Sequence, residues 1–181
     1  MSRETLFSAE DRSGNGNIYE NGKSNTFLLE HTGGFRPKEN YQISWNIWNE
    51  QPWLELESDF SYVRWQGRLG QIFHVGHRKL FQLDFIHGTT KGTTPLQKKF
   101  QLGSPSVLRG YPQHTVLSDE RLFASRLDYK FPLVTAPLWG IVSAFKIQGT
   151  VFYDQGKIWS KYNSYEQAKP VSYTHLRAHE T

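Results

Sequence analysis

Hydrophobic and polar residues alternate with a period of two along most of the chain after residue 23. The clearest example lies in residues 119–134, and its apolar face carries Phe123, Leu127, Tyr129, Phe131 and Leu133. The opposite face carries Ala124, Arg126, Asp128 and Lys130. Successive side chains of a strand point to opposite faces of a sheet, so this pattern predicts a strand with one apolar and one polar face.

The same alternation predicts further strands within residues 26–30, 41–47, 81–85 and 145–154. Between residues 54 and 71 the apolar positions change phase, which predicts a bulge or two tightly joined strands. Residues 1–23 are polar and rich in Gly and Asn, and we interpret them as a loop. No amphipathic helical period competes with these strands, so we expect an all-β, antiparallel protein.

Two all-β architectures produce this alternation. A transmembrane β-barrel turns its apolar face outward to lipid and its polar face inward to water. A soluble β-sandwich or small barrel turns the apolar face inward. The segment 119–134 is longer than the five or six residues usual in soluble strands and approaches the length of a tilted membrane strand, which favours the barrel.

Composition also favours a membrane barrel. Aromatic residues make up 15% of the chain, although the mean hydropathy is only −0.62. Such a combination is typical of barrels with aromatic girdles at the two membrane interfaces. No run of about 18 apolar residues occurs, which excludes a membrane-spanning helix. The apolar run of a signal peptide does not follow Met1 either, so we expect a fragment that lacks its true start.

Several other classes of function find no support in the sequence. The 21 basic residues are scattered and the net charge is +4, so no nucleic-acid partner is expected. The chain has no Cys, which removes disulfides and thiol chemistry. His74 and His77 form a close pair without matching carboxylates or thiols, so no metal site is predicted. No nucleophile elbow or phosphate-binding loop occurs, and we expect neither enzymatic activity nor a cofactor.

The longest aperiodic segment after residue 23 covers residues 91–118 and contains two short motifs. They are Phe100-Gln101-Leu102-Gly103-Ser104 and Leu108-Arg109-Gly110-Tyr111. A third motif, Phe152-Tyr153-Asp154-Gln155-Gly156, ends a predicted strand. Gly110 allows a sharp turn behind Arg109, whose guanidinium matches a carboxylate. The alternation places Asp154 and Asp128 on the same polar face of the predicted sheet.

These motifs resemble those of the BamA-type outer-membrane barrel superfamily, also called the bacterial surface antigen family. The resemblance covers residues 62–159, with Ser104 in place of the second Gly of a Phe-x-Leu-Gly-Gly step. In that superfamily, Arg-Gly-Phe/Tyr lies on an extracellular loop that folds into the barrel, and its arginine reaches acidic residues of the inner wall. The resemblance therefore implies a loop-lock motif made of Arg109, Gly110, Tyr111, Asp128, Phe152, Asp154 and Gly156.

The resemblance also implies an architecture and a function. The chain would hold about five to seven strands of a sixteen-stranded barrel preceded by periplasmic POTRA domains. It would insert or secrete polypeptides at the outer membrane of a diderm bacterium, without catalysis. Its partners would be outer-membrane lipid, client or secreted polypeptides, and periplasmic accessory proteins. Two alternatives stay open: an anchoring barrel of a fused patatin-like lipase or phosphoesterase, and a soluble β-sandwich binding module.

The last eleven residues, 171–181, require a separate interpretation. Their back-translation resembles the transposase mosaic end and adapter used to build sequencing libraries. We interpret them as a non-native tail on a partial barrel domain of residues 1–170, whose true C-terminus would be missing. Adapter sequence was never selected to bury a surface, so we expect this tail to lack packing partners.

Overall fold

The structure is a computed structural model that describes residues 2–6, 22–52, 58–76, 78–102, 107–109, 118–137, 144–168 and 170–180. Eight strands form one antiparallel sheet, in the order β1-β2-β3-β4-β5-β8-β9-β10. They are β1 (Ser2–Leu6), β2 (Gly22–Lys38), β3 (Tyr41–Pro52), β4 (Tyr62–His74), β5 (Leu80–Gly92), β8 (Arg121–Pro137), β9 (Ala144–Trp159) and β10 (Val171–Glu180). The predicted all-β, antiparallel class is confirmed.

The segment between β5 and β8 (residues 93–120), here called the inward loop, has structure of its own. It contains the 3-10 helix η1 (Leu96–Lys98) and the short strands β6 (Phe100–Gln101) and β7 (Ser118–Asp119). β6 and β7 pair with each other and close the base of the loop. A second 3-10 helix, η2 (Tyr165–Gln167), lies between β9 and β10.

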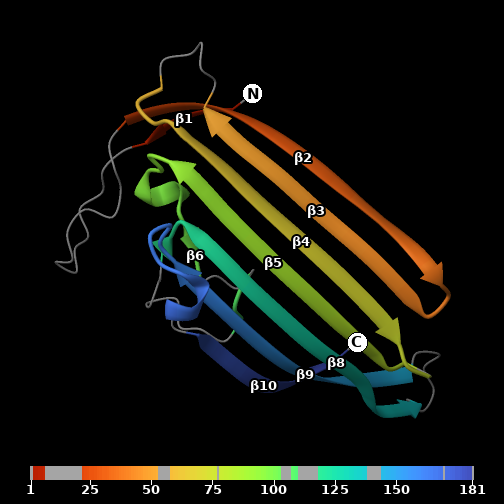
Figure 1. Ribbon diagram of the computed structural model, residues 1–181. Helices are drawn as coiled ribbons and strands as arrows, with labels where there is room; N and C mark the ends of the chain where they lie inside the picture. The colour runs from red at the N-terminus through yellow and green to blue at the C-terminus, as the bar shows by residue number, and fades with distance from the viewer. Residues whose placement is uncertain are drawn as a thin grey trace.

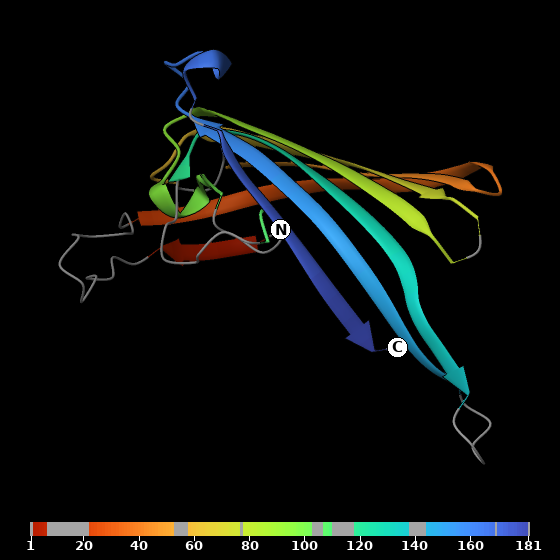
Figure 2. The same cartoon turned by 90° about the horizontal axis from the view of Figure 1, so that it is seen from below.

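The eight-stranded sheet is long and curved, and the inward loop lies on its concave side (Figure 1, Figure 2). β2 and β8 have 17 residues each and β9 has 16, well beyond the strand length usual in soluble sheets. Within the described ranges no second sheet of comparable size covers it, which argues against the sandwich. No helix among the described residues is apolar and long enough to span a membrane. The fold is that of a partial β-barrel wall.

The two faces of the sheet differ in chemistry. Directly paired residues share a face, and the pairs Asp84–Arg126 and Arg126–Asp154 continue a polar row across the concave face. Apolar side chains of β8 and β9 alternate with that row and lie on the convex face, as expected for a barrel whose apolar face points outward: Phe123, Leu127, Tyr129, Phe131, Ile147 and Val151. Exposed apolar side chains on the same convex face are Leu29, Phe35, Ile47, Trp65, Leu69, Phe81, Phe85 and Val151. Such a surface suits lipid rather than water.

Two expectations about the strands were wrong. Part of the N-terminal loop is strand, since β1 pairs with β2 and β2 already begins at Gly22. β2 also runs through Gly33 and Gly34. The phase change near residue 62 is not a bulge in β4, because residues 62–74 pair continuously with β5. Instead Tyr62 turns to the concave side, where its hydroxyl donates to Glu50.

Register shifts occur at two other places in the sheet. One lies between Phe35 and Lys38 and the other between Pro132 and Val134. Pro37 lies in the first shift, and Pro132 borders the second. Proline has no N–H to donate to the ladder, which explains an irregularity at each place.

The expectation that the tail would have no packing partner was also wrong. β10 pairs with β9 from Val171 opposite Gly156 to Glu180 opposite Ile147. Backbone N–H and C=O groups of β9 pair with any extended strand of suitable alternation, so ladder pairing depends little on side-chain identity. The pairing therefore leaves the adapter origin of residues 171–181 a prediction.

Candidate functional site

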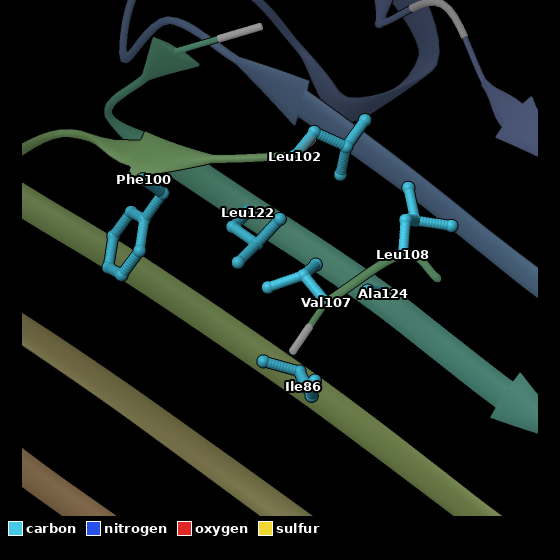
Figure 3. Packing of buried hydrophobic residues seen from close by; sticks show 7 residues of the cluster. All are labelled: Ile86, Phe100, Leu102, Val107, Leu108, Leu122 and Ala124. Atoms are coloured by element: carbon cyan, nitrogen blue, oxygen red, sulfur yellow. The ribbon is translucent and has the colours of Figure 1, made fainter. Parts of the chain in front are cut away.

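The inward loop packs on a small apolar patch of the otherwise polar concave wall. Figure 3 shows loop side chains lying over wall side chains of β5 and β8. The buried cluster consists of Phe100, Leu102, Val107 and Leu108 from the loop and Ile86, Leu122 and Ala124 from the wall. Full burial of a Leu or Phe side chain contributes about 1.5–3 kcal/mol. Apolar packing thus holds the loop against the wall.

Two glycines of the wall let the loop approach the backbone. A Cβ at Gly156 on β9 would lie 2.8 Å from Leu102 Cδ1 and 3.0 Å from Leu108 Cδ1. A Cβ at Gly88 on β5 would lie 2.5 Å from Cζ of Phe100. Gly156 belongs to the predicted motif, whereas Gly88 was missed. The signal that could have revealed it is a glycine within the polar row of an alternating strand.

Arg109 reaches both aspartates that share the polar face. Its backbone N and its Nε each donate to Asp154 Oδ2 at 3.0 Å. Its Nη1 donates to Asp128 Oδ2 at 3.0 Å, and its Nη2 donates to Asp154 Oδ1 at 2.6 Å. Nη2 also donates to Asp128 Oδ1. One guanidinium therefore binds two carboxylates on two neighbouring strands.

The surroundings of Arg109 strengthen these contacts. The Asp154 side chain is fully buried and that of Asp128 is 9% exposed, so little water competes for either carboxylate. The guanidinium carbon lies 4.3 Å from the ring centroid of Phe152. Burial acts to lower the pKa of Arg109, but the hydrogen bonds and charges of both aspartates outweigh it and raise this pKa above its usual range. Arg109 is therefore a permanent cation.

Other charged groups continue this network around the wall. Arg126 Nε lies 4.0 Å from Asp154 Oδ1. On the neighbouring strands, Arg68 Nε lies 3.1 Å from Asp84 Oδ1. Opposite charges alternate from strand to strand along the concave face, so each carboxylate has a nearby cation.

The structure brings together five of the seven predicted site residues. Arg109 contacts Asp128, Phe152 and Asp154, and Gly156 lies against the neighbouring Leu108. The other two predicted residues, Gly110 and Tyr111, lie outside the described residues. Sequence reasoning missed a second charged contact, between Lys98 of η1 and Glu50 of β3. No motif marks either residue. In the described part of the chain, no group of three or more His, Cys, Asp or Glu residues could hold a metal ion.

A curved antiparallel wall with an apolar outer face, and a loop tied to its inner face, defines an outer-membrane-type β-barrel. A family model described as the Omp85 superfamily domain matches residues 11–177, and the chain belongs to this superfamily. The motif resemblance is thereby confirmed. The match extends into β10. No curated protein matches the chain.

Members of this superfamily take part in insertion or secretion of proteins at the outer membrane of diderm bacteria. They contact client polypeptides and lipid, and they are generally not catalysts.

Proposed function

We propose that this chain is part of an outer-membrane barrel that inserts or translocates polypeptides without catalysis. In this proposal the three charged residues of the loop-lock motif, Arg109, Asp128 and Asp154, hold the inward loop against the wall. We call these three residues the loop lock. The observation that carries the proposal is the set of five hydrogen bonds from Arg109 to the two carboxylates. A solvated surface arginine would not bury its partner carboxylate completely.

The position of the loop suggests how it contributes. Its apolar side chains contact Ile86 on β5 and Leu122 on β8, and they also press on Gly156 of β9. The loop thus braces three adjacent strands. Insertion or passage of a client requires a place where strand pairing opens and backbone groups accept another strand. We infer that the brace keeps this part of the wall intact while pairing opens elsewhere.

The outer surface supports the proposed location and partners. Trp65 is 48% exposed and Leu29 57% exposed on the convex face, where outer-membrane lipid would cover them. Client or secreted polypeptides would approach from inside the barrel, or at the place in the wall where the pairing of two strands opens. Periplasmic accessory proteins would act through upstream POTRA domains. A patatin-like lipase or phosphoesterase encoded upstream would instead make the barrel an anchor.

The test uses the intact gene and compares Arg109→Ala with Arg109→Lys. We expect the alanine variant to lower client insertion or secretion more than it lowers the yield of folded barrel. The lysine variant should restore activity only in part, since an ammonium cannot bind two carboxylates as a planar guanidinium does. Folded barrel is measured by heat-modifiable migration, and activity by the amount of client inserted or secreted.

Arg36→Ala is the matched control for removal of an arginine. Arg36 is exposed on β2, and its Nη2 donates to Gln42 Oε1 at a long 3.4 Å. This control should keep both barrel yield and activity. Full activity of the Arg109→Ala variant at normal barrel yield would overturn the proposal.

A further inference from the structure

The inward loop touches the wall at a second charged site, on strands other than those of the loop lock. Lys98 Nζ lies 2.8 Å from Glu50 Oε1 on β3. Glu50 is only 6% exposed, and it also accepts hydrogen bonds from Tyr62 and Arg64 of β4. Removing the cationic partner of a buried carboxylate lowers the stability of the folded state, because the remaining charge is poorly solvated. Loss of an exposed surface pair has a much smaller effect on stability.

An aromatic stack reinforces this second site. The Arg64 guanidinium carbon lies 4.6 Å from the ring centroid of Trp48 on the wall and 4.6 Å from that of Phe100 in the loop. The ring of Phe100 in turn lies over Gly88. A cation between two aromatic faces is a favourable arrangement, and here one ring comes from each side of the contact.

The two charged sites lie on different parts of the wall. Lys98 and Phe100 contact β3 and β4, whereas Arg109 contacts β8 and β9, and β5 lies between these pairs in the sheet. A loop tied at one site could pivot about it. A loop tied at both sites spans the curve of the wall and fixes its own orientation.

We propose that Lys98, Glu50 and Arg64 form a second fastening of the inward loop, and that this fastening holds residues 96–102 on β3 and β4 independently of the loop lock. Lys98 is a positioning residue in this proposal, which rests on the proposed role of the loop. The Lys98–Glu50 ion pair joins loop and wall here, and the five hydrogen bonds of Arg109 join them at the loop lock. Loss of the Lys98–Glu50 contact would free residues 96–102, while Arg109 keeps its own hydrogen bonds to Asp128 and Asp154.

The second fastening lies next to an open space. A cavity of about 260 Å³ borders it, lined in part by Arg64, Gln66, Gln97, Lys99 and Phe100. By contrast, the side chains of Leu102 and Leu108 are almost completely buried. The cavity leaves Gln97 and Lys99 room to shift, whereas Leu102 of the same segment is held by packing.

A double-mutant cycle in the intact protein tests this inference. The variants are Lys98→Met, Glu50→Gln and their combination, and hydrogen–deuterium exchange is measured separately for residues 96–102 and for the segment around Arg109. We expect Lys98→Met to speed exchange of residues 96–102 by about tenfold, the change that corresponds to one ion-paired hydrogen bond lost from a closed state. Exchange around Arg109 should stay nearly constant. In the Glu50→Gln background, Lys98→Met should add little.

Lys99→Met is the matched control, because it makes the same change at the neighbouring residue of the loop. Equal exchange in the Lys98→Met and Lys99→Met variants would overturn the second fastening. An equal effect of Lys98→Met in both Glu50 backgrounds would also overturn it, because Lys98 would then act through another group. These outcomes are independent of the activity of Arg109→Ala, which tests the proposed function itself. Heat-modifiable migration verifies that every variant forms its barrel.

Discussion

Substitution of Gly156 by alanine separates packing of the inward loop from its charge contacts. The added methyl group would meet Leu102 Cδ1 at 2.8 Å and Leu108 Cδ1 at 3.0 Å. Both distances are shorter than the 3.5–4.0 Å optimum between carbon atoms. The variant substitutes none of the charged residues Arg109, Asp128 and Asp154. The loop must move away from β9 to make room for the added methyl group.

The size of the effect follows from burial. Leu102 is 0% and Leu108 1% exposed, so neither side chain has open space into which it can withdraw. Overfilling a well-packed site by one methyl group typically costs about 1–3 kcal/mol. A central value of about 2 kcal/mol corresponds to a roughly thirtyfold shift in the equilibrium between the seated and the displaced loop. We therefore expect a displaced loop in an intact barrel.

The assay compares Gly156→Ala with Gly67→Ala by hydrogen–deuterium exchange of residues 100–109. Gly67 lies on the convex face of β4, and a Cβ there would meet no atom within 4 Å. Replacement of this glycine by alanine should leave exchange of the loop unchanged and stabilise the strand by about 0.4–1 kcal/mol. Gly156→Ala should speed loop exchange by a factor near the thirtyfold shift worked out above. The barrel itself should still form in both variants.

The comparison has a clear negative outcome. If loop exchange in Gly156→Ala equals that in Gly67→Ala, the leucines do not rest on β9 and the packing described above is wrong. If Gly156→Ala prevents barrel formation altogether, the glycine serves the strand rather than the loop. Either outcome would contradict the assigned role.

Two further predictions concern the wall. Gly88→Ala should release residues 96–102, because the rigid ring of Phe100 would lie 2.5 Å from the new Cβ; unchanged exchange of that segment would contradict this contact. Phe85→Arg should lower the stability of the folded barrel in lipid vesicles by about 2–4 kcal/mol, since Phe85 lies on the convex face in the middle of β5. Gln82→Arg on the concave face of the same strand is its control, and equal folding of both variants would show that the faces are misassigned.

The sequence predicted the faces of the strands better than their ends. Side-chain direction in a strand is a local property, so alternation in residues 119–134 was enough to separate convex from concave positions. Strand ends depend on partners elsewhere in the chain. β1 and β10 both lie in segments interpreted as unpaired, and each becomes strand through pairing with a neighbour.

Site prediction had the same limit. Arg109 and the two aspartates could be connected because each lies in a recognisable motif or in a regular alternation. Glu50 and Lys98 have no such mark, and their contact depends on how far the loop reaches across β4 and β5. Gly110 and Tyr111 stay predictions. The functional role of the loop lock also stays a prediction, although the structure places its charged groups together.

The strand motif has a simple physical explanation in this structure. Phe152, Asp154 and Gly156 occupy every second position of β9, so all three project from its concave face. In that order they provide a ring beneath the Arg109 guanidinium, a carboxylate for it, and an open backbone for Leu102 and Leu108. The intervening Tyr153 is 39% exposed on the convex face and does not contribute to this surface. The motif is therefore one continuous stripe on which the loop rests, and a change at any of its three positions acts on the loop without altering the lipid-facing side.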